Sequence, residues 1–409
     1  MPSPRLSNSD TMPDMRLRMI AKPVWAALAL FTITGAASPA QSSGGVQVAS
    51  IRKVVNGTIQ PLMGADGIPG MAVAVTVNGT SYVFNYGVAS KSPRAPVTDG
   101  TLFEIGSLSK TFTATMAAWA QARHRLFLTD SVDKYLPEFS GTPFGRVNLI
   151  SLGTHTPGGL PLQVPADVTS DAALMRYLEQ WRPRYKVGAY RTYSNISIGM
   201  LGVVTAKSMG EDFRVLAQRQ LFPSLGLKHT FIDIPAGELP QYAWGYTDKG
   251  EPIRMKLGVL AHEAYGIRTT AGDLMRFVQE NIDPSTLPVS LRQAIVQTHT
   301  GYFQAGPMIQ DLIWEQYPYP VTMASLRTGN SYAMIFDATP VRAIVPPESP
   351  NGGVWLNKTG STNGFGAYAA FIPSKRLGVV LLANRNYPIA DRVAAAYRIL
   401  TDLGPIYDV

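Results

Sequence analysis

Hydrophobic and polar residues alternate in short segments near both ends of the chain, which is the pattern of β-strands. Near the N-terminus, residues 71–77 and 81–88 alternate in this way, and Asn78-Gly79 between them is a hairpin-turn signal. Three further segments lie near the C-terminus, at residues 354–361, 365–372 and 377–383. Short turns join neighbouring segments, so we predict one antiparallel five-stranded sheet made from both ends of the chain.

Between and outside these strands, apolar residues recur at helical spacing. The expected helices cover residues 46–62, 110–123, 172–180, 196–207, 213–220, 271–281 and 390–403. The pattern predicts an α/β fold, in which the sheet and its flanking helices form one lobe (residues 41–103 and 340–409). Residues 104–339 are expected to form an inserted, mostly helical lobe, with an active-site cleft between the two. Residues 300–350 resist assignment, because proline, tyrosine and glycine interrupt any period.

The composition is that of an ordinary globular protein, with 45% hydrophobic and 16% charged residues in a chain of 409. The net charge is +8, of which four basic and two acidic residues within positions 1–40 contribute +2. No dense run of lysine and arginine is present, which argues against nucleic-acid binding. A mildly positive protein suits small anionic substrates.

The first 40 residues have the pattern of a secretory signal peptide. Basic residues between Arg16 and Lys22 precede an apolar stretch from Val24 to Ile33, and Ser38-Pro39-Ala40 is a plausible cleavage site. We expect export to the periplasm, with no stable membrane insertion after processing; a retained membrane anchor is the alternative. The chain contains no cysteine, which excludes disulfides and a thiol nucleophile.

Ser107 and Lys110 are spaced so that both side chains lie on one face of a helix. A serine is a weak nucleophile until a base stands beside it, and the lysine amine at this spacing can take that role. Gly106 permits a tight turn into the helix, which places Ser107 where backbone amides can stabilise an oxyanion. Taken alone, the serine is more simply explained as a helix N-cap and the lysine as a solvated helix residue.

Two later motifs supply partners for this pair. Tyr193, two residues before Asn195, is a phenol that nearby lysines would make a usable acid or base. Lys358-Thr359-Gly360 offers a positive charge, a hydroxyl donor and a strand edge open to a ligand, and the amide of Ser361 is a candidate second oxyanion donor. The alternatives are that Asn195 caps a helix and that Lys358 only protects an edge strand.

Other kinds of chemistry have little support in the sequence. The five histidines are scattered without an H-x-H or H-E-x-x-H pair, so we expect no metal and no cofactor. A Ser-His-Asp triad is not excluded by residue counts, but no G-x-S-x-G motif accompanies it.

In this order, the motifs resemble those of class C serine β-lactamases, the AmpC type. The matching segments are FEIGSLSKTF at 103–112, GGLPLQ at 158–163, KTGSTNGFG at 358–366 and LANRNYP at 382–388. The resemblance covers nearly all of the chain after the leader and implies a β-lactamase/transpeptidase-like fold. The tyrosine at 193, where class A enzymes carry a serine, favours class C.

The resemblance also implies roles for substrate-binding residues. By analogy, Gln163 and Asn195 hold the acylamido side chain of the antibiotic, while Lys358, Thr359 and Asn386 meet its carboxylate end, with Arg392 nearby. Tyr265 is similar to the Ω-loop tyrosine that walls the side-chain pocket. Two positions depart from the family pattern: Ile389 stands where a second asparagine is common, and Pro157 precedes the Gly158-Gly159 pair.

The sequence therefore predicts a monomeric, periplasmic serine β-lactamase with a preference for cephalosporins. Ser107 would attack the lactam carbonyl, the amides of Ser107 and Ser361 would hold the oxyanion, and Tyr193 or Lys110 would move the protons. Which of the two is the base at each step stays open, because they would titrate as a coupled pair. A D-alanyl-D-alanine carboxypeptidase, a penicillin-binding protein or an esterase on the same scaffold is the alternative. A β-lactam-binding sensor without turnover is a third reading.

Overall fold

A ten-stranded antiparallel sheet organises the computed structural model, which describes residues 40–407 and forms one compact unit from Val46 onwards. The five predicted strands are present and adjacent, in the order β15-β16-β17-β1-β2. Their bounds are Gly70–Val77 for β1, Thr80–Lys91 for β2, Val354–Ser361 for β15, Gly366–Ile372 for β16 and Leu377–Ala383 for β17. The predicted antiparallel sheet made from both ends of the chain is confirmed.

The sheet is larger than the five strands that the sequence predicted. One extra strand, β3, extends the edge formed by β2, and four more continue from β15 in the order β12-β11-β10-β14. These strands are Arg94–Pro96 (β3), Gly301–Ala305 (β10), Met308–Gln310 (β11), Glu315–Pro318 (β12) and Arg342–Glu348 (β14). Strands β10 to β12 are short and buried on both faces, so they show no alternation for sequence reasoning to detect.

The two ends of the chain are joined through strand pairing. Strand β1 pairs with β17 from Met71 opposite Ala383 to Val77 opposite Leu377, and it pairs with β2 on its other side. The β1–β2 turn is the predicted Asn78-Gly79, and both residues have positive φ, 50° and 85°. This backbone matches the twist of a two-residue hairpin.

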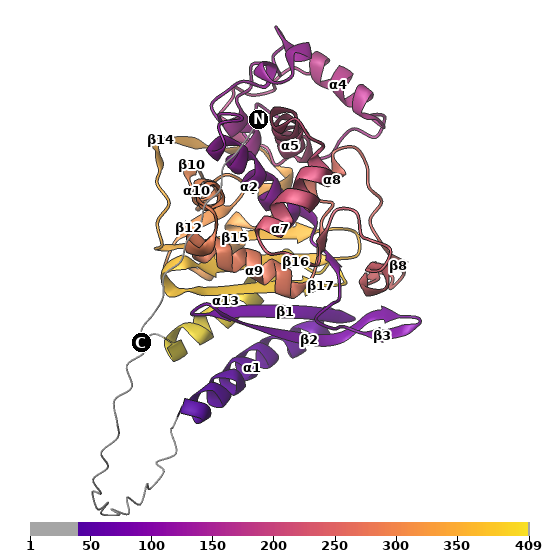
Figure 1. Ribbon diagram of the computed structural model, residues 1–409, viewed down its shortest axis with the longest axis vertical. Coiled ribbons are helices and arrows are strands. Elements are labelled where there is room, and N and C mark those ends of the chain that lie inside the picture. Colours follow the sequence, from indigo (N-terminus) through magenta and orange to yellow (C-terminus); the bar gives the residue numbers. More distant parts are fainter. Residues whose placement is uncertain (1–39, 408–409) are drawn as a thin grey trace, which may run out of the picture. The chain divides into compact units, whose positions relative to one another are not determined.

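Helices cover both faces of the sheet, so successive residues of β1 enter different cores (Figure 1). Met71, Val73 and Val75 pack with helices α1 (Ala40–Ala65) and α13 (Ile389–Tyr407) on one face. Ala72 and Ala74 face the opposite core, which includes α2 (Ser109–Ala122) and α9 (Ala271–Ile282). A strand has a side-chain period of two, so this alternation follows directly from β1 being buried on both sides.

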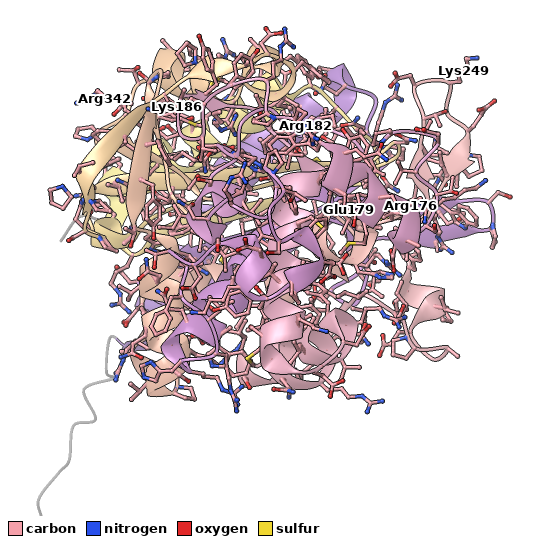
Figure 2. All side chains as sticks on the ribbon, turned by 90° about the horizontal axis from the view of Figure 1, so that it is seen from above. Arg176, Glu179, Arg182, Lys186, Lys249 and Arg342 are labelled. Carbon is pink, nitrogen blue, oxygen red and sulfur yellow. The ribbon has the colours of Figure 1, made fainter. Side chains whose placement is uncertain are left out.

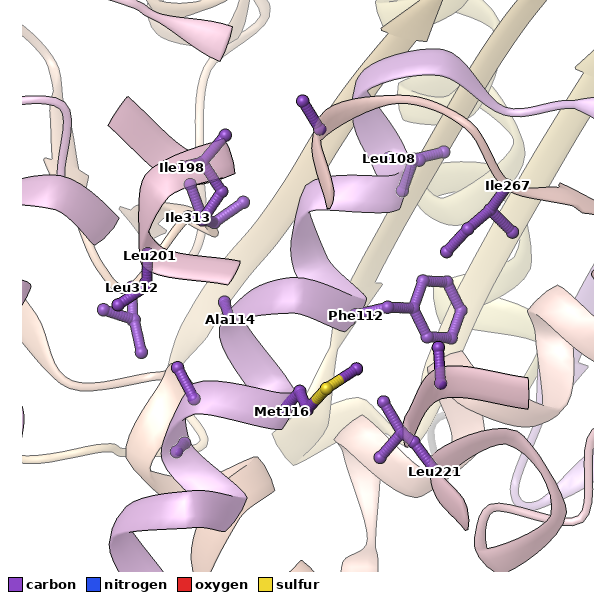
Figure 3. Close-up of a cluster of buried hydrophobic side chains, with 14 of the residues drawn as sticks. Leu108, Phe112, Ala114, Met116, Ile198, Leu201, Leu221, Ile267, Leu312 and Ile313 are labelled. Atoms are coloured by element: carbon purple, nitrogen blue, oxygen red, sulfur yellow. The ribbon is translucent and has the colours of Figure 1, made fainter. Parts of the chain in front are cut away.

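Helix α2 is buried nearly all round, which makes it a rigid support for the residues at its N-terminal end. All twelve residues from Ser109 to Ala120 are buried. Figure 3 shows Phe112 and Met116 of α2 near Leu221 and Ile267, and the Phe112 ring stacks on Phe277 of α9 with centroids 4.1 Å apart. Helices α5 (Asn195–Met209) and α10 (Val289–Thr298) also pack against α2.

Shorter elements complete the described chain. The remaining helices are α3 Leu149–Gly153, α4 Asp171–Gln180, α6 Phe213–Val215, α7 Phe222–Ser224, α8 Ala261–Ala264, α11 Met323–Gly329 and α12 Tyr332–Phe336. Two-residue strands are β4 Phe103–Glu104, β5 Tyr190–Arg191, β6 Thr230–Phe231, β7 Gly245–Tyr246, β8 Pro252–Ile253, β9 Arg268–Thr269 and β13 Thr339–Pro340. The helix predicted at 213–220 is interrupted by a π-helical turn from Leu216 to Leu221.

Most charged side chains lie at the surface, including the six labelled in Figure 2, which are all exposed: Arg176, Glu179, Arg182, Lys186, Lys249 and Arg342. No helix within residues 40–407 is long and apolar enough to cross a membrane. The predicted signal sequence falls almost wholly outside the described residues, and the division into two lobes stays a prediction.

Candidate active site

The predicted nucleophile lies in a tight turn at the start of α2. Residues Gly106 to Leu108 form a single 3₁₀ turn, here called the nucleophile turn, which leads directly into Ser109 of the helix. Gly106 has φ +50°, a left-handed conformation that a glycine adopts without steric cost. Because Ser107 lies in this turn and not in the buried helix, its side chain lines a cavity.

The nucleophile turn lies directly against strand β15, with no room for a side chain between them. A Cβ on Gly360 would come within 1.9 Å of the Ile105 carbonyl oxygen, and a Cβ on Gly106 would lie 2.6 Å from the Ser361 amide nitrogen. Two glycines are therefore required at this contact. It brings the backbone of Ser361 beside Ser107, as two donors for one oxyanion would need.

Lys110 lies on the next turn of α2, beneath Ser107. Its Nζ donates to Ser107 Oγ over 2.8 Å and to the backbone oxygen of Ala264 over 3.0 Å. The side chain is completely buried. Burial, together with the charge of Lys358, lowers the pKa of Lys110 from 10.5 to about 8, because a buried ammonium loses its hydration.

Tyr193 is surrounded by three cationic side chains. Lys358 Nζ lies 5.0 Å from the centre of its ring, and Lys110 Nζ and Arg191 Cζ each lie 5.2 Å from it. Burial disfavours the phenolate, but the charges of Lys110 and Lys358 outweigh this and lower the pKa of Tyr193 from 10.0 to about 8. The neighbouring Ser107 hydroxyl also lowers the pKa of Tyr193.

His155 packs against the same phenol, and the sequence analysis did not single it out. The His155 and Tyr193 ring centroids are 4.4 Å apart, and His155 Nδ1 accepts from the amide of Ser194 over 3.3 Å. Burial and the charges of Arg191 and Lys110 hold the pKa of His155 well below its usual value. The imidazole is therefore neutral, and it contributes packing rather than a further charge.

Glu315 and Arg191 are the charged residues that sequence reasoning missed. Glu315 Oε1 lies 3.1 Å from Lys358 Nζ and 3.5 Å from Arg191 Nη2, and all three side chains are buried. Burial lowers the pKa of Lys358, but Glu315 outweighs it and raises that pKa above its usual value, so Lys358 stays charged. A glutamate between Trp314 and Gln316 was a weak signal, since it lies in the segment without a readable period.

Gln163 and Asn195 are hydrogen-bonded to each other where both line the cavity. Asn195 Nδ2 donates to Gln163 Oε1 over 2.8 Å, while the buried Oδ1 of Asn195 has no partner among the described residues. The N-cap of α5 is Ser194, whose hydroxyl accepts from Ser197 N, so the capping interpretation of Asn195 is wrong. The Asn195 side chain is thereby available to the cavity.

One cavity of about 670 Å³ connects these side chains. Apart from the buried Lys110, every predicted site residue lines it: Ser107, Gln163, Tyr193, Asn195, Lys358, Thr359, Ser361 and Asn386. Tyr265 also lines it, as does the departing residue Ile389, and α12 adds the exposed aromatic side chains of Tyr332 and Phe336. Residues 40–407 contain no cluster of three or more acidic or histidine side chains suited to a metal ion.

Comparison of the sequence with known proteins identifies the family of this chain. The family model described as beta-lactamase matches residues 55–403. The chain belongs to the beta-lactamase family. A beta-lactamase of Pseudomonas fluorescens is 48% identical over 86% of this chain and 98% of its own length.

Solved structures of the family are similarly close. A structure described as the D-alanine carboxypeptidase AmpC of Burkholderia cenocepacia is 54% identical, with a TM-score of 0.83, covering 87% of this chain and 99% of its own. A class C β-lactamase in complex with cefoxitin is 49% identical, with a TM-score of 0.84, over 86% and 99%. The predicted resemblance to class C enzymes is confirmed.

Proposed function

We propose that this protein is a class C serine β-lactamase that hydrolyses the lactam amide, with cephalosporins as preferred substrates. The observation that carries the proposal is the 2.8 Å bond between Lys110 Nζ and Ser107 Oγ at the floor of the cavity, beside a phenol whose pKa is lowered. The solved relative in complex with cefoxitin supports the substrate class.

In the first half-reaction, Ser107 Oγ forms an ester bond to the lactam carbonyl carbon, and the carbonyl carbon–nitrogen bond breaks. The amides of Ser107 and Ser361 stabilise the oxyanion in between. The serine proton passes through Lys110 or Tyr193 to the departing ring nitrogen. In the second half-reaction Tyr193 takes a proton from a water that attacks the ester carbonyl. The carbon–oxygen bond to Ser107 then breaks, and that proton passes to Ser107 Oγ.

The cavity walls supply binding groups for the rest of the substrate. Gln163 and Asn195 offer amide donors and acceptors for an acylamido side chain, and Lys358 with Thr359 offers a charge and a hydroxyl for a carboxylate. We also propose that the leader directs the protein to the periplasm, where it acts as a monomer. N-terminal sequencing and light scattering of the exported protein test these two points.

Turnover of a chromogenic cephalosporin by purified protein tests the main proposal. Mass spectrometry after mixing should show a Ser107 adduct that decays rapidly to the free mass, and no adduct in Ser107→Ala. A folded protein without turnover of any β-lactam would refute the proposal.

A D-alanyl-D-alanine carboxypeptidase is the second candidate, favoured by the description of the Burkholderia cenocepacia relative. It would use the same serine, lysine and tyrosine, but its penicilloyl adduct would persist for many minutes. The lifetime of that adduct separates the two activities.

A further inference from the structure

Arg392 lies in the first turn of α13, where a cation is electrostatically unfavourable because the helix dipole is positive there. The side chain is nevertheless completely buried. A buried guanidinium is costly unless its donors are satisfied, so its hydrogen bonds account for its position.

All five N–H donors of this guanidinium are used within the protein. Nε donates to the Tyr387 carbonyl over 3.0 Å, and Nη1 donates to the Gly360 carbonyl over 2.7 Å and to Ser361 Oγ over 2.9 Å. Nη2 donates to Asn386 Oδ1 over 2.6 Å and also to the Tyr387 carbonyl. No donor is left for a substrate carboxylate, and Arg392 does not line the cavity.

We propose that Arg392 is a positioning residue that holds the oxyanion-binding edge of β15 and the substrate-facing amide of Asn386 in fixed orientations. The inference rests on the proposed function and goes beyond the expectation that Arg392 lies near the carboxylate end of the substrate. Its Nη1 bonds both Gly360 and Ser361, the two residues joined by the peptide whose nitrogen lies against Gly106 of the nucleophile turn.

The bond to Asn386 fixes the orientation of that side chain. An arginine only donates, so it can bond the amide oxygen of Asn386 and not the amide nitrogen. Oδ1 is therefore turned toward Arg392, and the Nδ2 donors are left for other partners. Because Asn386 lines the cavity, donors are the groups it has available for an anionic substrate.

The surroundings of the guanidinium leave it little freedom. A Cβ on Gly366 would lie 2.9 Å from Arg392 Cζ, so the absence of a side chain at 366 makes room for the guanidinium. On another side, the ring of Tyr387 lies 4.8 Å from Cζ. The arginine therefore has one position, which a lysine cannot reproduce, because its three donors share a single atom.

Arg392→Lys tests this proposal, because it keeps the positive charge and removes the guanidinium, whose donors on three nitrogen atoms make these bonds. Oxyanion stabilisation is needed for every substrate, so kcat/KM for a chromogenic cephalosporin should fall about 10- to 100-fold, a fraction of what loss of a whole oxyanion donor costs. Phenylboronic acid, which adds to a serine oxygen as a tetrahedral anion and carries no carboxylate, should bind more weakly by a similar factor.

Arg385→Lys is the matched control, since Arg385 lies in the loop between β17 and α13 and donates to the carbonyls of Gly67 and Asp248, away from the cavity. Both of its readouts should stay within about twofold of the wild type. If Arg392→Lys does not fold, Gly366→Ala displaces the guanidinium while keeping Arg392, and it should weaken both readouts together.

Two results would overturn the proposal. Weaker cephalosporin turnover with unchanged phenylboronic acid binding would make Arg392 a carboxylate ligand. If a folded Arg392→Lys variant keeps both its kcat/KM for the cephalosporin and its affinity for phenylboronic acid, the guanidinium has no positioning role. Failure of the proposed function is distinguishable, because the wild-type protein itself would then not turn over a cephalosporin.

Discussion

Lys110 is a cationic acid and Tyr193 a neutral one, yet the site lowers the pKa of each to about 8. Below this pH the ammonium and the phenol both hold their protons. In the proposed mechanism, loss of one proton from the pair creates the base that activates Ser107 or water. The two groups are close enough to titrate together, so the pH dependence belongs to the pair.

The first prediction is that kcat/KM of the wild-type enzyme rises by up to about tenfold per pH unit below pH 8, because the unprotonated fraction of the pair grows at that rate. Steady-state rates on a chromogenic cephalosporin between pH 5 and 9 measure it. A flat profile over that range would contradict the assignment of Lys110 and Tyr193 as the acid–base pair.

Tyr193→Phe keeps the packing against His155 and removes the hydroxyl. Turnover should fall by about two to four orders of magnitude, the range for positioned acid–base groups, and an acyl-enzyme should accumulate because Lys110 remains beside Ser107. Mass spectrometry detects that intermediate. Tyr302→Phe, which removes a buried hydroxyl outside the cavity, is the control. Near-native turnover of Tyr193→Phe would mean that Lys110 serves both half-reactions.

At the scale of elements, the site depends on the direct contact between the nucleophile turn and strand β15. The turn sits at the end of the buried helix α2, and Gly360 belongs to a strand paired on both sides. Neither element can move away to accept a new side chain, so a single methyl group at this contact would separate Ser107 from the amide of Ser361.

Gly360→Ala should therefore lower turnover by at least about two orders of magnitude, the cost of losing one oxyanion donor. The matched control is Gly57→Ala in α1, where a Cβ would meet nothing within 4 Å. That change should leave turnover unaltered and raise the free energy of unfolding by about 0.5–1 kcal/mol, because alanine favours a helix over glycine. Steady-state kinetics and urea denaturation report the two effects. Equal turnover in both variants would contradict the close contact.

At the scale of the whole molecule, the buried ion network joins three distant segments. Arg191 comes from β5, Glu315 from β12 and Lys358 from β15. The carboxylate of Glu315 balances the positive charges of Arg191 and Lys358 near Tyr193. Its bond to Lys358 also links β12, one of the extra strands, to the predicted strand β15. The site and the fold therefore share this interaction.

Glu315→Gln should lower the free energy of unfolding by about 3–5 kcal/mol, because it leaves buried cations without their carboxylate. It should also move the rising limb of the pH profile to lower pH, since the charge of Glu315 raises the pKa of Tyr193. Asp402→Asn, which breaks an exposed pair with Arg398, is the control and should cost less than about 1 kcal/mol. Urea denaturation and pH–rate profiles test both parts; a loss of stability no larger than in the control would contradict the first.

The sequence by itself determined the features that depend on neighbouring residues. The hairpin at Asn78-Gly79, the strand ending at Ser361 and the serine–lysine spacing at the start of α2 follow from turn chemistry and from side-chain period, both of which are local. The order of the motifs was enough to group the chain with class C enzymes, because that order needs no coordinates.

Only the tertiary structure decided which distant residues meet. Strands β10 to β12 carry no period because both faces are buried, so their place in the sheet was not readable. Glu315 reaches Lys358 across 43 positions, and Arg392 reaches Gly360 across 32. A buried ion pair or a fully bonded guanidinium leaves no local pattern, since its partners are set by the folded path of the backbone rather than by spacing along the chain.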